Sequence, residues 1–276
     1  MTQHRMGAQW LRHVILVLFA FLTFYPFLFM IITSLKNNHQ FYHFFWRPIV
    51  FPVEWYNWVL AWRQVRGYIL NSVIVSGVSI IGVLIIASLA AYAFARGRFP
   101  GRNVLFGSII VLMMFPGVLT IIPSFHLVKA LGLLNTYWVM ILPDIAYLQI
   151  LSIYILRTFF ESQQPELFEA ARIDGANELQ AFYRIAIPLA RPVLGVIAII
   201  TLLATWNDFI WPLLTVTKGS IQPITVGLTY FTSGTFRQAF GPLMAGYTIA
   251  SLPLIILFGL FMRTFIEGMS AGAVKL

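Results

Sequence analysis

The sequence contains no cysteine and few charged residues, and both shortages restrict what the protein can be. Without cysteine, neither a disulfide framework nor a thiolate metal site can form. Charged residues make up 10% of the 276-residue chain, whereas a soluble domain has about 25%. Hydrophobic residues make up 59%. The composition therefore predicts an integral membrane protein.

Acidic residues are scarcer than basic ones, so the formal net charge is +9. In a soluble protein this charge would suggest nucleic acid as a partner. Here the basic residues mostly flank apolar runs, where they act as signals of membrane topology. We therefore expect the chain to lie in the lipid bilayer and to bind no nucleic acid.

Six apolar runs are long enough to cross the hydrocarbon core of a bilayer, which takes about 20 residues. The first is too long for the apolar region of a signal peptide and no small-residue cleavage site follows it, so we expect it to be retained. The predicted fold is an all-α polytopic membrane protein forming one transmembrane domain, residues 1–276. The spans are expected near residues 14–34, 69–95, 104–124, 137–157, 192–214 and 242–264.

The loop between the second and third spans indicates the orientation. Arg96, Arg98 and Arg102 fall close together there without an acid, so this loop should be cytoplasmic. Six spans then place both termini inside, with eleven Lys and Arg residues inside and seven outside. Four of the outside charges lie in the long first loop, residues 35–68, whose four tryptophans suggest a segment at the membrane interface.

Prolines interrupt several of the predicted spans: Pro26, Pro116, Pro143 and Pro253. A helix bundle tolerates such kinks because neighbouring groups satisfy the freed backbone. They are either ordinary kinks or features that shape a cavity and let helices move. The two halves of the chain show no convincing internal repeat, which weighs against an inverted-repeat secondary transporter.

A polar stretch, residues 165–188, stands out in this apolar chain because it holds four of its nine acids. Pro165 suits the first position of a helix, and Leu167, Ala170 and Ala171 would share its apolar face. Gly175 would end that helix in the left-handed conformation. The stretch therefore begins with a short amphipathic helix.

Asn177 and Gln180 resemble a capping box that opens a second helix. We expect this helix to end before Pro188 and to carry apolar residues on one side. The two helices would form a helix-turn-helix at the cytoplasmic surface. The residues of that apolar side are Leu179, Phe182, Tyr183 and Ala186.

The same stretch carries a family resemblance. Glu169-Ala170-Ala171, Gly175 and the ending Ile185-Ala186-Ile187-Pro188 resemble the EAA signature of the membrane subunits of bacterial ABC importers, with Ile187 where that family usually has Leu. Ile173-Asp174-Gly175-Ala176 is similar to the carbohydrate-importer branch. We call residues 159–190 the coupling loop.

Short motifs along the rest of the chain resemble the same family in sequence order. Together they resemble the second, G-type permease subunit of maltose-like sugar importers. The motifs are Asn71-Ser72, Ala90 to Arg96, Leu131-Gly132-Leu133 with Asn135-Thr136, Trp206-Asn207-Asp208 and the ending Ala271 to Lys275.

The resemblance implies a division of labour among several polypeptides. The coupling loop would dock into a cleft on a dimer of cytoplasmic ATPase subunits, and the C-terminal tail would lie against that dimer. A second permease subunit would complete the translocation path, an extracytoplasmic solute-binding protein would deliver the cargo, and the location would be the bacterial inner membrane. The implied contact residues are Glu169, Ala170, Ala171, Arg172, Asp174 and Gly175 in the loop, and Gly272, Val274 and Lys275 in the tail.

The chain lacks the motifs of an enzyme. The nearest approach to a phosphate-binding loop, residues 217–220, has glycine and lysine in the wrong order. No zincin pattern and no Gly-x-Ser-x-Gly elbow occurs. We therefore expect no catalytic or metal site and no cofactor in this chain, with ATP and Mg²⁺ bound by the partner ATPase subunits.

Polar residues within the spans are candidates for the substrate path. Asp144 and Asp208 each lie about 10 Å from the outer end of a predicted span, at a rise of about 1.5 Å per residue. Ionisable groups at such depth usually face a cavity, although Asp208 could instead cap or bridge helices. Aromatic and amide neighbours would suit sugar rings and hydroxyls: Tyr147, Trp206, Asn207 and Trp211.

Three classes of function remain open from the residues. The first is a permease of an ABC importer for a sugar, an oligosaccharide or a related polyol; the second is an ion-coupled secondary transporter; the third is a membrane scaffold without transport. In the maltose-like family the sugar can contact mainly the other permease subunit.

Overall fold

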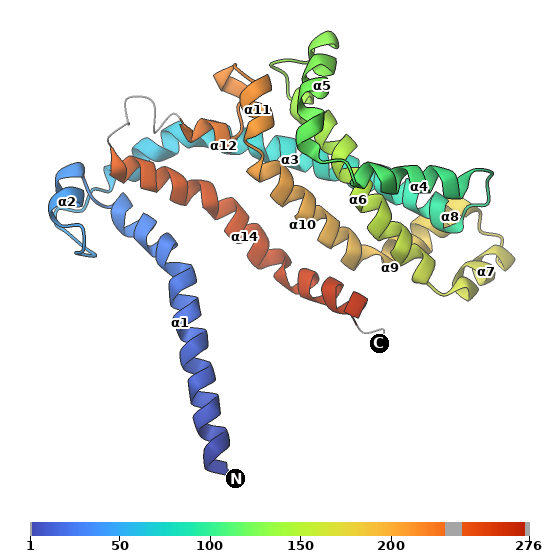
Figure 1. Ribbon diagram of the computed structural model, residues 1–276, viewed down its shortest axis with the longest axis horizontal. Coiled ribbons are helices and arrows are strands. Elements are labelled where there is room, and N and C mark those ends of the chain that lie inside the picture. The colour runs from blue at the N-terminus through green and yellow to red at the C-terminus, as the bar shows by residue number, and fades with distance from the viewer. Residues whose placement is uncertain (1, 230–238, 274–276) are drawn as a thin grey trace. The chain divides into compact units, whose positions relative to one another are not determined.

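The computed structural model describes residues 2–229 and 239–273, and every regular element in those ranges is a helix (Figure 1). A π-helical turn, Phe182–Ala186, and a 3-10 turn, Gly219–Ile221, join some of the helices. The helices are α1 (Thr2–Ser34), α2 (Asn38–His43), α3 (Tyr56–Arg96), α4 (Arg102–Met113), α5 (Gly117–Ala130), α6 (Trp138–Ser162), α7 (Pro165–Ile173), α8 (Glu178–Ala181), α9 (Ile187–Leu189), α10 (Arg191–Asn207), α11 (Ile210–Thr215), α12 (Ile224–Gly227) and α14 (Phe240–Ala273).

Four of these helices are long and apolar enough to cross a membrane, and they belong to α1, α3, α6 and α14. Two sharply bent pairs bring the number of candidate spans to as many as six: α4 with α5, and Glu178–Leu189 with α10. A polytopic, all-helical membrane protein is therefore confirmed for the described residues. The division into six single spans stays a prediction.

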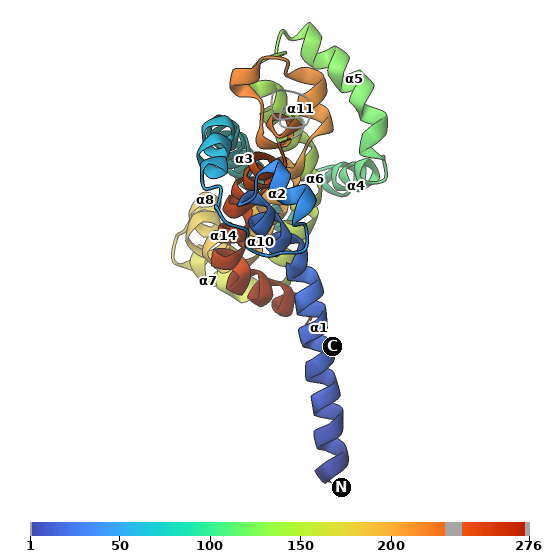
Figure 2. The ribbon, with the colours of Figure 1, turned by 90° about the vertical axis from the view of Figure 1, so that its left-hand side faces the viewer.

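The third predicted span, residues 104–124, is not one continuous helix. α4 ends at Met113, α5 begins at Gly117, and their axes differ by 102°. Figure 2 shows this bend. Pro116 explains it, because a proline has no N–H for a helical bond and disfavours the helical conformation of the residue before it. The backbone of Pro116 is extended.

The fifth predicted span, residues 192–214, is also interrupted. α10 ends at Asn207, Asp208 is extended, and the short α11 starts at Ile210. The Asp208 carboxylate accepts a hydrogen bond from the backbone N–H of Trp211 at 3.4 Å, as a side chain does at the start of a helix. The Asp208 carbonyl accepts another from the Thr225 hydroxyl at 2.6 Å. These two hydrogen bonds give the carboxylate and the carbonyl of Asp208 partners at the point where α10 has ended.

Internal contacts divide the chain into two compact units. The first consists of Met1–Arg66 and Leu228–Pro253. Its loop after α1 is held by Lys36, whose buried amine donates to the carbonyls of Phe44 and Phe45, both at 3.1 Å. Burial lowers the pKa of this amine. Lys36, one of the basic residues predicted to lie outside, therefore also stabilises the loop after α1.

The second unit, Gly67–Gly227 with Leu254–Leu276, contains both candidate sites. Within it, α6 packs against α4 and α10 (Figure 1). Gly82 of α3 lies against the Ile145 side chain of α6, where a larger residue would collide with it. The core of this unit continues into the coupling loop through Phe160, Phe168 and Phe182. The loop is therefore packed onto the spans and does not hang free.

Candidate functional site

The first helix of the coupling loop is α7, and the sequence explains its bounds. Pro165 occupies the first turn, where its missing N–H costs nothing, and Glu166 adds a favourable negative charge there. Arg172 lies in the last turn, where a positive charge is favourable. A single helical segment of nine residues results, as predicted.

Gly175 makes the turn after α7. Its φ is +81°, in the left-handed region that side chains disfavour. The turn is closed by a hydrogen bond from the N–H of Ala176 to the carbonyl of Ala171 at 2.9 Å. Both halves of the predicted capping box are present, since the Asn177 side chain bonds the N–H of Gln180 and the Gln180 side chain bonds the N–H of Asn177. The predicted helix-turn-helix is confirmed.

The second helical stretch runs further than predicted. α8 passes into the π-helical turn Phe182–Ala186, and α9 continues through Pro188 to Leu189. The expectation that this helix ends before Pro188 is wrong. A π-helical turn bonds from residue i to i+5, which widens the helix just before the proline, whose ring and missing N–H would otherwise disrupt an α-helical turn.

The buried faces of the loop differ from the predicted ones. On α7 the buried residue is Phe168, 3% exposed, whereas Leu167 and Ala170 are exposed. In the second stretch Phe182 and Ala186 are buried as predicted, but Leu179 and Tyr183 are exposed. Phe168 and Phe182 face inward because Tyr92 of α3 lies beside both rings, with centroids 6.3 and 5.1 Å away.

The outward side of the loop combines charge with apolar surface. Glu169 and Asp174 are exposed, and their carboxylates make no hydrogen bond or ion pair within the described ranges. Ile173 is 86% exposed. Arg172 pairs with Glu178 at 2.8 Å, and this hydrogen bond raises the pKa of its guanidinium. The loop thus presents a surface of mixed chemistry that nothing in the described chain covers.

The predicted tail contacts cannot be placed. Val274 and Lys275 lie outside the described residues, and Gly272 lies within the last turn of α14.

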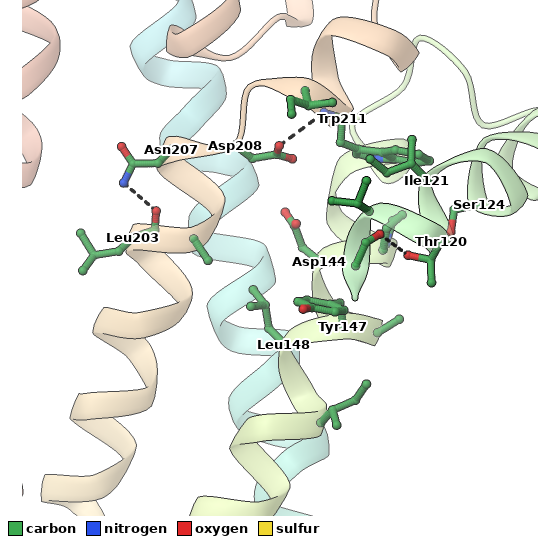
Figure 3. Close-up of a pocket in the computed structure, with 17 residues that line it drawn as sticks. Thr120, Ile121, Ser124, Asp144, Tyr147, Leu148, Leu203, Asn207, Asp208 and Trp211 are labelled. Carbon is green, nitrogen blue, oxygen red and sulfur yellow. Dashed lines mark hydrogen bonds between the residues drawn. The ribbon is translucent and has the colours of Figure 1, made fainter. Parts of the chain in front are cut away.

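The second candidate site is a cavity of about 630 Å³ between α5, α6, α10 and α11 (Figure 3). Five of the six predicted path residues line it: Asp144, Tyr147, Asn207, Asp208 and Trp211. The two carboxylates reach it from different helices, Asp144 from α6 and Asp208 from the break after α10. Packing of the helices therefore brings together two carboxylates that are far apart in the sequence.

The polar groups that line the cavity differ in whether they already form hydrogen bonds within the protein. The Asp144 carboxylate accepts no hydrogen bond from the residues that the structure describes, so both its oxygens are free for a ligand. Asn207 donates to the Leu203 carbonyl at 2.8 Å, and the indole N–H of Trp211 donates to the Val139 carbonyl at 2.7 Å. Asp208 combines its capping bond with a place in the cavity wall, so both of its predicted roles coexist.

Trp206, the sixth predicted path residue, does not line the cavity. It is only 3% exposed and lies in the interior of the second unit. Its neighbours Asn207 and Asp208 line the cavity, but the indole of Trp206 is packed among other side chains. Trp206 is therefore not part of this cavity wall.

The cavity also contains residues that the sequence reasoning missed, on the first two turns of α5. Gly117, Thr120, Ile121 and Ser124 recur at i, i+3, i+4 and i+7, the spacing of one helix face. That pattern was present in the sequence. The predicted span, residues 104–124, is one continuous helix and therefore does not reveal that a new helix starts at Gly117.

Chemically, this cavity suits a polyhydroxylated solute. Its lining combines two carboxylates, an amide, hydroxyl groups, a tyrosine and a tryptophan, and includes no lysine, arginine or histidine. Carboxylates and amides accept or donate hydrogen bonds to hydroxyl groups, while aromatic rings pack against apolar faces. Its size is within the range of about 300–1,000 Å³ found for small-molecule sites.

Comparison with known proteins identifies the family of this chain. Residues 83–270 match the family described as "Binding-protein-dependent transport system inner membrane component". The chain is 33% identical over 265 residues to the probable ABC transporter permease protein YurM of Bacillus subtilis, covering 95% of this chain and 87% of that protein. It is 30% identical over 270 residues to the diacetylchitobiose uptake system permease protein NgcG of Streptomyces coelicolor, covering 96% and 88%.

The fold also occurs in a solved structure, the crystal structure of a bacterial ABC transporter involved in the import of the acidic polysaccharide alginate. The likeness covers 92% of this chain and 95% of that one, with a TM-score of 0.75 and 22% sequence identity. At this identity the likeness concerns the fold alone.

Proposed function

The chain belongs to the family of binding-protein-dependent transport system inner membrane components, and from this membership we propose that it is the permease subunit of an ATP-driven sugar importer. The family is defined by dependence on a binding protein, which favours this function over an ion-coupled secondary transporter. The observation that carries the proposal is the coupling loop, a rigid helix-turn-helix packed onto the spans with an uncovered outer surface.

In this proposal the coupling loop docks on a cytoplasmic ATPase subunit. Glu169 and Asp174 would meet cationic groups there, and Ile173 would bury its exposed side chain. Ile173 is 86% exposed, so docking would remove its apolar surface from water. The pair of Arg172 with Glu178 and the turn at Gly175 keep the two short helices in one arrangement, so a displacement of α7 moves both helices together.

The remaining subunits follow from the same premise. A second permease subunit completes the translocation path, and a solute-binding protein presents the cargo outside the cell. ATP and Mg²⁺ bind to the separate ATPase dimer, since the sequence of this chain has no phosphate-binding loop. Gly272, Val274 and Lys275 are proposed to contact that dimer.

The proposed location is the bacterial inner membrane, with both termini and the coupling loop in the cytoplasm. The arginines at 96, 98 and 102 support this orientation because cytoplasmic loops carry an excess of positive charge. Residues 1–276 would act as one permease domain with six membrane crossings, two of them made by bent helix pairs.

The proposed cargo is an oligosaccharide or a related polyol. The relative NgcG is named for diacetylchitobiose uptake, and the cavity at α5, α6, α10 and α11 offers the carboxylates and aromatic rings that bind such solutes. Asp144, Tyr147, Asn207, Asp208 and Trp211 are proposed to form this chain's part of the path.

Co-purification with an ATPase subunit tests the proposal. The wild-type chain, tagged and purified in mild detergent from its host, should carry ATP hydrolysis with it, and Glu169→Lys should remove most of that hydrolysis. Glu161→Lys is the matched control: it makes the same change of charge at the end of α6, outside α7 and its turn, on a residue whose exposed pair with Arg157 contributes less than about 1 kcal/mol. Purified wild-type chain that drives uptake from an ion gradient without any ATPase would overturn the proposal.

A further inference from the structure

Arg96 is the last residue of α3 and lies at the point where α3, α6 and α7 meet. Its Nη2 donates to the carbonyl of Phe160 at 2.8 Å and to that of Gln163 at 2.7 Å. Both carbonyls belong to the end of α6, whose last four carbonyls lack partners within the helix. The positive charge also interacts favourably with the negative end of the α6 dipole.

The same guanidinium also contacts the coupling helix α7. Its carbon lies 4.3 Å from the centre of the Phe168 ring, within the range of a cation–π interaction. Phe168 is the buried residue of α7. One side chain therefore joins the end of α3, the end of α6 and the inner face of α7.

The chemistry of this junction requires arginine and not only a positive charge. The flat guanidinium directs two N–H groups of one nitrogen at two carbonyls while its face covers an aromatic ring. A lysine ammonium is a compact point charge and cannot meet all three groups in this arrangement.

The Arg96 junction is part-buried, and the neighbouring Gln163 is buried. A second link, from Tyr92 to Glu178 at 3.2 Å and from Glu178 to Arg172, joins α3 to α8 and α7 but is partly exposed to water.

We propose that Arg96 is a positioning residue that locks α7 to the ends of α3 and α6, so that movement of the coupling helix is passed to both spans together. The inference rests on the proposed function of the coupling loop. Under this proposal, the distance between α7 and α3 stays constant throughout the ATP cycle. Loss of the guanidinium lets α7 move without the spans, and ATP is then hydrolysed without import.

A distance measurement in the assembled importer tests the lock. Because the chain has no cysteine, Ala93→Cys on α3 and Glu166→Cys on α7 introduce the only thiols of this subunit, and both positions are exposed. Spin labels there report the separation of the two helices, first without nucleotide and then with ATP and vanadate. The variants are Arg96→Met, which keeps the length of the side chain, and Arg96→Lys, which keeps its charge.

We expect one narrow distance in the wild type in both states, a broadened distribution in Arg96→Met and an intermediate one in Arg96→Lys. The number of cargo molecules imported per ATP should fall about 2-fold to 30-fold, the range that 0.5–2 kcal/mol of lost coupling corresponds to. Arg98→Met is the matched control, because Arg98 is exposed and makes no hydrogen bond or ion pair in the described chain. It removes the same charge from the same loop and should match the wild type.

The proposal is overturned if Arg96→Met shows the narrow wild-type distance in both states. It is also overturned if uptake and ATP hydrolysis fall in equal proportion, as they would from a smaller amount of folded complex. If Arg96→Met does not assemble, Arg96→Lys and Phe168→Leu are judged by the same two criteria. A wild-type chain that assembles with no ATPase would refute the proposed function, whereas the distance between the labels in the isolated subunit would still decide whether the lock exists.

Discussion

Replacing Gly175 by alanine should loosen the turn of the coupling loop without any steric collision. A methyl group at this position would meet no atom within 4 Å, so the effect comes from the backbone alone. The φ of +81° lies in the left-handed region, which costs an L-amino acid with a side chain about 1–2 kcal/mol. At about 1 kcal/mol, the population of the open turn rises about fivefold.

Hydrogen exchange in the assembled complex measures this change directly. The amide of Ala176, bonded to the Ala171 carbonyl at 2.9 Å, should exchange about fivefold faster in Gly175→Ala. Gly175→Asn should lie between wild type and alanine, because asparagine tolerates the left-handed region better than other side chains. The order glycine, asparagine, alanine is itself part of the prediction.

The control for Gly175→Ala is Gly107→Ala. Gly107 lies within α4, where a methyl group again meets nothing within 4 Å, but its φ is not positive. Alanine is favoured over glycine in a helix by about 1 kcal/mol, so this change should not accelerate exchange anywhere. Equal exchange of the Ala176 amide in wild type and Gly175→Ala would refute the reasoning from φ.

Two further predictions concern the cavity and the outer loops of the second unit. Asp208→Asn should lower uptake of the cargo, selected from a panel of labelled neutral oligosaccharides that includes diacetylchitobiose, by about tenfold, as loss of one charge-assisted hydrogen bond would. Trp211→Ala should lower the same uptake because it removes an aromatic face from the cavity wall. Wild-type uptake and ATPase stimulation in both variants would exclude this path. Asn135→Ala should lower the melting temperature more than Asn135→Gly, because its φ is 60° and its side chain accepts bonds from Thr217 and Lys218; equal melting temperatures would contradict this.

The turn of the coupling loop was predictable because its causes are local. The capping box joins Asn177 to Gln180, three residues apart, and the conformation of Gly175 follows from its missing side chain. Short-range hydrogen bonds of this kind form from neighbouring residues whatever the rest of the protein does. The bend at Pro116 also has a local cause: the sequence marks it as an interruption of the third span, but not as a 102° change of direction between two helices.

The buried faces of the loop were not predictable from spacing. Leu167, Ala170 and Ala171 recur as an apolar face should, yet Phe168 is the residue that packs inward. Its partners are Tyr92 and Arg96, more than 70 positions earlier in the chain. A helix of nine residues has too few positions for periodicity to decide which side is covered, so distant aromatic groups decide it.

The cavity shows the same division. Asp144 and Asp208 were identified from their depth in apolar runs, and both line the cavity. Trp206 was included because it is adjacent in sequence, and the direction of its side chain excludes it. Thr120 and Ser124 were missed because only the start of α5 at Gly117 turns them toward the two aspartates.

The sequence by itself determined that this chain is a helical membrane protein, that residues 165–188 form two short helices about Gly175, and that it resembles a family of importers. Composition, caps and left-handed glycines act within a few residues, so they can be read along the chain. Tertiary structure alone decided which groups surround Arg96, which the sequence marked as a cytoplasmic charge and as the end of the motif Ala90 to Arg96. Its hydrogen-bond partners are 64 and 67 residues away, and only folding brings them within 3 Å of its guanidinium.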